Sequence, residues 1–178
     1  MNKLFSLEKR KVKYVRLEVD LNGIKIIAPE NQLLSYEAIL NKYDNWINKS
    51  LVKLNELKEL SKNLVFYNHQ NFEKIVYFYI EEISNFLGTK PNKVFFRKMK
   101  KRWGSCQHKK KNLIFNKFLK FLPETLIKYV VLHEMVHLLV PTHKKEFWFL
   151  IKKFDNDYKE KEKLLTAYIF KLLNENFY

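Results

Sequence analysis

The spacing of apolar and polar residues predicts two strands and a long helix in the first third of the chain. Residues 11–28 hold two runs rich in Val, Ile and Leu on either side of Asn22-Gly23. Asn-Gly readily takes the two positive-φ positions of a type I′ turn, so this stretch is typical of a β-hairpin. From Ser35, which can cap a helix, apolar residues recur every three or four positions, and we predict one helix to about Leu60.

The middle of the chain predicts a helix followed by two strands. Residues 71–87 have helical periodicity, and Gly88 is the expected left-handed stop. The runs Lys93–Met99 and Leu113–Leu119 are typical of strands, and the basic segment KKRWGSCQHKKKN between them is expected to be a turn.

The last third predicts helices only. Pro123-Glu124 is a favourable start, because proline fits the first turn and a carboxylate is stabilised near the positive end of the helix dipole. The helix that begins there carries the segment His133–His137. Two more helical stretches are expected at about 143–154 and 159–174.

These elements predict an α+β fold. We expect a hairpin-and-helix region at residues 1–65, docked as one compact body on an α+β region at residues 66–178. With 47% hydrophobic residues in 178, the chain can bury a sizeable core. No apolar run of about 18 residues occurs, so no membrane span is expected. The charged N-terminal segment and the single cysteine, Cys106, favour a cytoplasmic protein.

The net charge of +15 raises the question of a nucleic-acid partner. Of the 34 basic residues only four are Arg, and Asn, Ile and Phe are also abundant. An A/T-rich genome produces this skew without selection for a ligand, and arginine is the residue preferred for bidentate phosphate recognition. Nucleic acid bound through a basic surface therefore remains a candidate partner that the sequence does not favour.

The segment HEMVHLLVPTH, residues 133–143, carries the strongest chemical signal. His133 and His137 are four residues apart on a helix, so their Cβ atoms lie about 5–6 Å apart on one face and both rings can reach one metal ion. Glu134 lies beside such an ion rather than on it, where a carboxylate can take a proton from a metal-bound water. The pattern predicts a zinc site for hydrolysis. A buried helix that merely contains histidines is the alternative, but burying these three polar groups is costly unless each is satisfied.

A hydrolytic zinc site needs a third protein ligand and an open fourth position. The residue before a proline is pushed out of the helical region, so Val140-Pro141 forces a turn that can bring His143 back to the ion. A glutamate on a later helix is the alternative third ligand, and the candidates are Glu160 and Glu162.

Two longer segments carry a resemblance to a known family. RKMKKRWGSCQHKKKNLIFN and FLPETLIKYVVLHEMVHLLVPTHKKEFW resemble the YgjP-like metallopeptidases, a bacterial group related to the SprT-like and WLM minigluzincin-type zinc proteases. The resemblance implies His133, His137 and His143 as zinc ligands and Glu134 as catalytic base. It also implies a minigluzincin-like core made of a short antiparallel sheet and the HExxH helix.

Residues near the RWGSC segment are candidates for substrate contact, each with a structural alternative. Trp103 is a core or cleft-wall aromatic, and Gly104 marks a close approach of the backbone. Arg102 is a candidate for binding a substrate carboxylate or phosphate, or for a salt bridge. Asn116 is a substrate or structural contact on strand 113–119, whose edge we expect to pair with an extended peptide. Cys106 is more typical of a buried thiol than of a ligand.

The resulting prediction is a zinc metallopeptidase with one Zn²⁺ per chain, in which zinc-bound water, assisted by Glu134, hydrolyses a peptide or protein substrate. Tyr158 and Tyr168 are candidates for stabilising the oxyanion. The alternative is a nucleic-acid-binding protein with a closed structural zinc site that includes Cys106. A third hypothesis is an interaction module without metal. The oligomeric state cannot be predicted from the sequence.

Overall fold

The computed structural model describes residues 5–20, 23–30, 36–175 and 177. The fold is α+β, as predicted, and the chain divides into two compact units, Met1–Glu59 and Leu60–Tyr178. The division into regions 1–65 and 66–178 stays a prediction. Within the described residues, no helix is both long and apolar enough to cross a membrane.

The first unit contains a three-stranded sheet in the order β1-β3-β2. The central strand β3 is parallel to β1 and antiparallel to β2, so the predicted hairpin is β2 with β3, and β1 is an additional strand. Gly23 pairs with Asp20 and therefore belongs to β3, so the prediction that Asn22-Gly23 forms the turn is wrong by one residue. The connection uses residues 21 and 22, which lie outside the described residues. The strands are β1 (Phe5–Arg10), β2 (Arg16–Asp20) and β3 (Gly23–Pro29).

Two helices follow this sheet in place of the single predicted one. They are α1 (Tyr36–Lys42) and α2 (Asp44–Lys62), separated by Tyr43. Ser35, the predicted cap, lies outside the described residues. Ile39 and Ile47 on the two helices share a small buried cluster with Ile24 and Ile26 of β3, which explains the helical spacing of the apolar residues.

The second unit contains a sheet in the order β4-β6-β5. It is mixed rather than wholly antiparallel, because β6 is parallel to β4 and antiparallel to β5. The segment predicted as a basic turn contains strand β5, so the prediction of a simple turn is wrong. Central strand β6 has both edges paired, so the expectation that it offers an edge to a peptide is also wrong. The strands are β4 (Lys93–Arg97), β5 (Gly104–Gln107) and β6 (Asn112–Asn116).

Asn116 ends β6 three residues earlier than predicted. Its side-chain oxygen accepts hydrogen bonds from the backbone N–H groups of Met99 and Phe118, and its side-chain nitrogen donates to the carbonyls of Met99 and Arg102. The side chain is 1% exposed. Asn116 thus joins the loop before β5 to the 3-10 helix Lys117–Phe121, and this structural contact leaves the amide no free group for a substrate.

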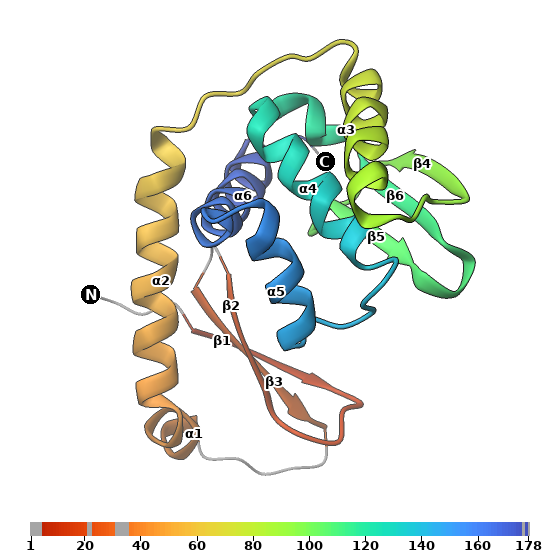
Figure 1. Ribbon diagram of the computed structural model, residues 1–178. Helices are drawn as coiled ribbons and strands as arrows, with labels where there is room; N and C mark the ends of the chain where they lie inside the picture. The colour runs from red at the N-terminus through yellow and green to blue at the C-terminus, as the bar shows by residue number, and fades with distance from the viewer. Residues whose placement is uncertain (1–4, 21–22, 31–35, 176, 178) are drawn as a thin grey trace. The chain divides into compact units, whose positions relative to one another are not determined.

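Helix α4 lies in the middle of the second unit, in contact with α3, β5, α5 and α6 (Figure 1). Nine of its residues are buried. As predicted, α3 is ended by Gly88, which has φ 65° and donates its N–H to Ser84 at 2.9 Å. The helices are α3 (Phe72–Leu87), α4 (Glu124–Val136), α5 (Lys145–Phe154) and α6 (Tyr158–Asn174).

Asn116→Ala should lower the free energy of unfolding by about 2–4 kcal/mol, because the substitution leaves buried backbone groups without partners. Chemical denaturation measures the change. Asn112→Ala at the other end of β6 is the matched control, since its side chain bonds only the exposed Gln107, and we expect a change within about 0.5 kcal/mol. Equal effects of the two substitutions would contradict the structural role of Asn116.

Candidate metal centre and active site

Helix α4 presents His133 and Glu134 and ends at Val136, so that His137 is its cap residue. The rings of His133 and His137 lie one helical turn apart, with centroids separated by 5.0 Å. The helix position is fixed by the buried apolar residues around these polar ones, which include Tyr129, Val130, Leu132 and Met135.

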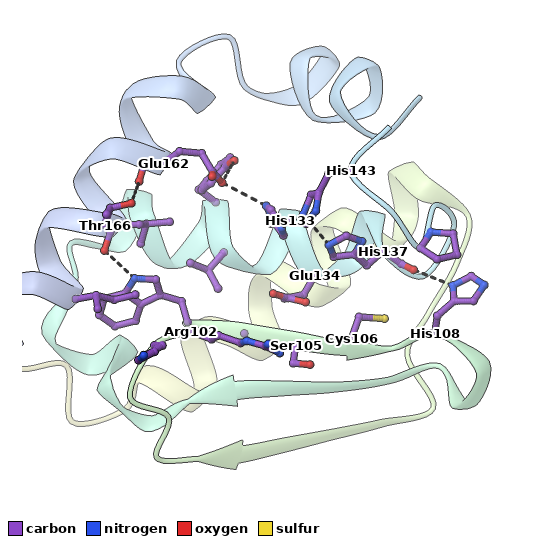
Figure 2. Close-up of a pocket in the computed structure, with 18 residues that line it drawn as sticks. Arg102, Ser105, Cys106, His108, His133, Glu134, His137, His143, Glu162 and Thr166 are labelled. Carbon is purple, nitrogen blue, oxygen red and sulfur yellow. Dashed lines mark hydrogen bonds and ion pairs between the residues drawn. The ribbon is translucent and has the colours of Figure 1, made fainter. Parts of the chain in front are cut away.

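The turn after α4 returns His143 to the other two histidines (Figure 2). In the turn after the helix end at Val136, the N–H of Val140 bonds the carbonyl of Val136 at 2.9 Å, and Pro141 follows. The Nε2 atom of His143 lies 2.9 Å from Nε2 of His133 and 3.1 Å from Nε2 of His137. Within the part of the chain that the structure describes, these three form the one cluster suited to hold a metal ion.

The other ring nitrogens decide what this cluster can bind. Nδ1 of His137 lies 3.0 Å from the carbonyl oxygen of Val140, which can only accept, so Nδ1 carries the proton. Nδ1 of His133 lies 3.4 Å from the carboxylate of Glu162 and is held as a donor in the same way. Both Nε2 atoms then face the cluster with lone pairs, which a cation held between the three rings can accept. Nitrogens on one tetrahedral zinc lie roughly 3.3–3.4 Å apart, close to the observed spacing.

Burial favours the neutral imidazoles that a metal requires. It lowers the pKa of His137 to about 4, with the hydrogen bond to Val140 opposing the shift, and it lowers the pKa of His143 as well. Both rings are therefore uncharged at neutral pH and can act as ligands without first losing a proton.

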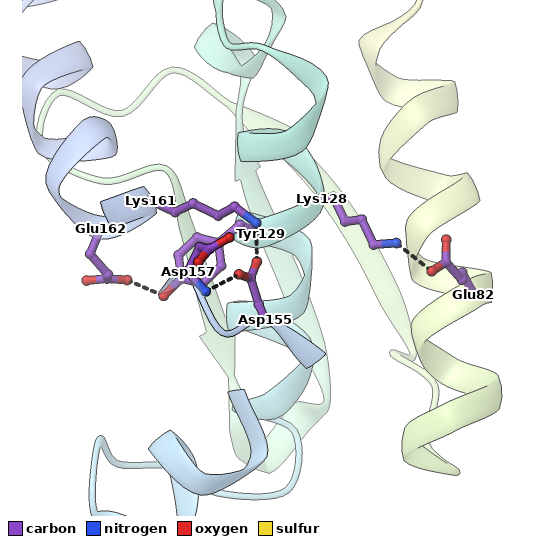
Figure 3. A network of polar contacts seen from close by, with 7 residues as sticks. All are labelled: Glu82, Lys128, Tyr129, Asp155, Asp157, Lys161 and Glu162. Carbon is purple, nitrogen blue, oxygen red and sulfur yellow. Dashed lines mark hydrogen bonds and ion pairs between the residues drawn. The ribbon is translucent and has the colours of Figure 1, made fainter. Parts of the chain in front are cut away.

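Glu162 lies behind His133 rather than inside the cluster. Burial alone would raise the pKa of Glu162, but hydrogen bonds from His133 and Tyr129 lower it. The Tyr129 hydroxyl donates to Glu162 at 2.7 Å (Figure 3). At the start of α6, Asp155 accepts from the Lys161 ammonium and from the backbone N–H of Asp157. These contacts hold the start of α6, the helix that carries Glu162. Glu160, the other candidate ligand, does not line the pocket.

Glu134 is 6% exposed, and its Oε2 atom has no hydrogen-bond partner among the described residues. Burial raises its pKa to about 7, against the opposing charges of His133 and Arg102. Its side chain packs on Gly104 of β5: a Cβ at that position would lie 2.5 Å from Cγ of Glu134 and 2.6 Å from Oε1. The predicted close approach at Gly104 is therefore present, and it leaves space for the carboxylate.

A pocket of about 620 Å³ opens beside these groups and contains two of the three predicted substrate residues. Arg102 lines it with an exposed side chain. Trp103 forms part of the wall and donates its Nε1–H to the carbonyl of Leu165 on α6 at 2.9 Å. Asn116 does not line the pocket. Residues of α6, including Thr166 and Ile169, also line the pocket. They were not predicted, because the sequence alone does not show that α6 packs on α4.

Neighbouring aromatics pack the histidine turn. Phe147 is fully buried, with ring centroids 4.5–4.9 Å from all three histidines. The candidates for stabilising the oxyanion are not in the pocket: Tyr158 stacks on Trp148, and Tyr168 donates its hydroxyl to the carbonyl of Val65. His108 also lines the pocket and was not predicted as a site residue. Its Nδ1 lies 2.9 Å from the carbonyl oxygen of His137.

An α+β unit whose central helix carries HExxH, with a third histidine returned to the same point, has the features of a metallopeptidase. Residues 58–168 match the model of the YgjP-like metallopeptidase domain, and the chain belongs to this family. It is therefore a zinc metalloprotease, a hydrolase with a metal cofactor that acts on peptides or proteins.

Two crystal structures of metallopeptidase zymogens are similar to the chain. Abylysin of Pyrococcus abyssi is 24% identical, with a TM-score of 0.48, and the match covers 52% of this chain and 92% of that one. Jannalysin of Methanocaldococcus jannaschii is 26% identical, with a TM-score of 0.43 and coverage of 52% and 91%. The comparison with curated proteins found no match.

The Cys106 thiol should react slowly with iodoacetamide. Burial, with a smaller effect of the Glu134 charge, raises its pKa to about 11. At pH 8 its reactive thiolate is scarcer than that of a free cysteine by more than about 100-fold. The rate, followed by mass spectrometry on the folded, metal-free chain, should rise about tenfold per unit from pH 8 to 10. The control is the same chain in urea, and equal rates would contradict the shift.

Proposed function

We propose that the chain hydrolyses peptide bonds with one zinc ion held by His133, His137 and His143 and with Glu134 as general base. The observation that carries this proposal is the convergence of three Nε2 atoms, with adjacent separations of 2.9 and 3.1 Å, while the Nδ1 atoms of His133 and His137 face acceptors. That arrangement of neutral donors suits a divalent cation and leaves the pocket side open for a substrate.

Zinc bound there would polarise the scissile carbonyl and acidify a water molecule. Glu134 takes the proton of the attacking water and later delivers it to the leaving amine. Two features of its surroundings support this role. The Oε2 atom has no competing hydrogen bond among the described residues, and the burial that raises its pKa makes the carboxylate a stronger base than an exposed one.

Glu162 acts in this proposal as a positioning residue and not as the third zinc ligand. Its carboxylate faces Nδ1 of His133 and is itself held by the Tyr129 hydroxyl. A carboxylate in that place fixes the tautomer of a metal-bound histidine and increases its basicity.

The outer edge of β5 is the proposed binding position for an extended substrate. β5 lies at the end of its sheet, lines the pocket and contacts α4. A peptide that pairs with a free strand edge is held through its main chain, which tolerates many sequences. In this arrangement Trp103 forms the wall of the site, and Arg102 is a candidate contact for a substrate carboxylate.

A structural zinc site in a nucleic-acid-binding protein is the less well supported alternative. It calls for four protein ligands, but Cys106 is not part of the cluster that could hold a metal within the described residues. It also gives no role to Glu134, whose burial is costly.

Elemental analysis of protein purified without a metal-affinity tag tests the proposal. We expect about one zinc per wild-type chain, a large loss in His143→Ala, and no loss in His69→Ala, a histidine outside the pocket. Glu134→Gln should keep its zinc and lose peptide hydrolysis by about 100- to 10,000-fold. Folded wild type that takes up no zinc, or a Glu134→Gln variant with wild-type turnover, would refute the assignment.

Gly104→Ala should lower turnover at least about tenfold without loss of zinc, because the new Cβ displaces the Glu134 carboxylate. Ser105→Ala, the neighbouring change on β5, is the control. Gly104→Ala is also expected to lower the free energy of unfolding, because the new Cβ meets the Glu134 side chain. In a Glu134→Ala background that contact is absent, and Gly104→Ala should no longer lower the free energy of unfolding. An equal loss of stability in both backgrounds would show that the two residues are not coupled.

A further inference from the structure

One segment carries most of the net charge of the chain. Residues 83–123 contain 12 of the 34 basic residues and none of the 19 acidic ones. The rest of the chain holds 22 basic and 19 acidic residues, which is close to balance. A general excess of lysine codons does not explain 41 consecutive residues without an acid. The segment contains all three strands of the second sheet.

The cations of this segment are available to a partner. Eleven of the twelve are exposed, and Lys120 is half-buried. Only Lys90 forms an ion pair among the described residues, with Glu81 at 2.6 Å. Arg97, Lys98 and Lys120 lie over aromatic rings, which does not neutralise their charge.

Six of these residues flank β5 on both sides in the sequence KKRWGSCQHKKK. Lys101 and Arg102 line the pocket before the strand, and His108 lines it after the strand, followed at once by Lys109 and Lys110. Figure 2 shows Arg102 and His108 toward opposite ends of the strand that carries Ser105 and Cys106. Four residues of strand span roughly 14 Å, so the two groups of cations are separated by about four residues of a paired peptide.

Other residues that line the same pocket are apolar or acidic. Val130 and Leu165 contribute apolar surface there, and Glu134 and Glu162 contribute carboxylates. A bound zinc ion would offset the charges of these two carboxylates, so the centre of the site attracts no charged side chain, whereas an acidic side chain further out would meet lysines.

We propose that the substrate is an extended peptide with uncharged residues around the scissile bond and acidic residues roughly three or four positions away on both sides. This inference rests on the proposed function and names the substrate class of the same site. Acidic flanks are attracted to the two ends of β5, which speeds encounter and fixes the position of the peptide along the strand.

A peptide fits these observations better than a nucleic acid does. Ten of the twelve cations are Lys, a point charge without the bidentate fork that favours Arg at phosphates. The charges also flank a strand edge beside the catalytic pocket, and a strand edge binds a polypeptide main chain.

The test uses three fluorogenic peptides with one neutral core and flanks of Glu, Gln or Lys. With the zinc-loaded full chain in 50 mM NaCl, we expect kcat/KM for the Glu peptide to exceed that for the Gln peptide at least about tenfold, and the Lys peptide to be slowest. In 500 mM NaCl the preference should largely disappear. Equal values for the Glu and Gln peptides at low salt would overturn the proposal.

Charge reversal locates the effect. With two further peptides that carry Glu on one flank and Gln on the other, Lys109→Glu/Lys110→Glu should abolish the preference for Glu on one flank only. The control, Lys152→Glu/Lys153→Glu on α5, changes the net charge equally at exposed positions that do not line the pocket, and it should keep the preference. Loss of the preference in both variants would mean that net charge, and not the flanks of β5, selects the substrate.

Binding separates this inference from the proposed function. Fluorescence anisotropy of labelled peptides on zinc-loaded Glu134→Gln should rank the Glu peptide above the Gln peptide, whether or not the wild type cleaves either. If the Glu peptide binds more tightly than the Gln peptide but neither is cleaved, the result counts against the proposed hydrolysis and not against the preference for acidic flanks. A single-stranded oligonucleotide with the same number of charges that binds tenfold more tightly than the Glu peptide would overturn the proposal in favour of nucleic acid.

Discussion

The hydrogen bond between Nδ1 of His137 and the carbonyl oxygen of Val140 joins the residue that caps helix α4 to the turn that follows it. The same contact fixes the proton of the ring on Nδ1, so Nε2 points toward the other histidines with a lone pair. It also holds the chain at the point where Pro141 prevents the helix from continuing, and His143 returns from there. One local interaction therefore sets the tautomer of one ring and the position of another.

The strand opposite this helix is constrained just as strongly. Gly104 is needed because the Glu134 side chain fills the space that a Cβ would take. The strand is kept at that distance by its pairing with β6 and by Asn116, whose amide bonds both ends of the loop before β5. Buried amides that bond several backbone groups contribute to stability well beyond their size. The short segment between Met99 and Gly104 therefore affects both the position of the Glu134 side chain and the stability of the fold.

What could be predicted from the sequence was mostly local. The helix with His133 and His137 follows from apolar spacing and from a start signal at Pro123, and the return of His143 follows from the proline turn. β5 was missed because its four residues lie among lysines and include no β-branched or aromatic residue that would mark a strand. Glu162 was, with Glu160, a candidate for the alternative third ligand, and only the packing of α6 on α4 places it behind His133.

The distribution of charge follows from the same architecture. Two carboxylates lie close to the proposed metal site: Glu134, which is buried, and Glu162, which is held by hydrogen bonds. Lys101 and Arg102 line the pocket, and the other cations near β5 lie at its two ends, where they are exposed to water. A lysine placed beside Glu162 would pair with that carboxylate and disturb the orientation of His133, whereas a glutamate at the strand ends would repel an acidic substrate. In the proposed function, the cations at the ends of β5 therefore direct the substrate without forming an ion pair to Glu134 or Glu162 among the described residues.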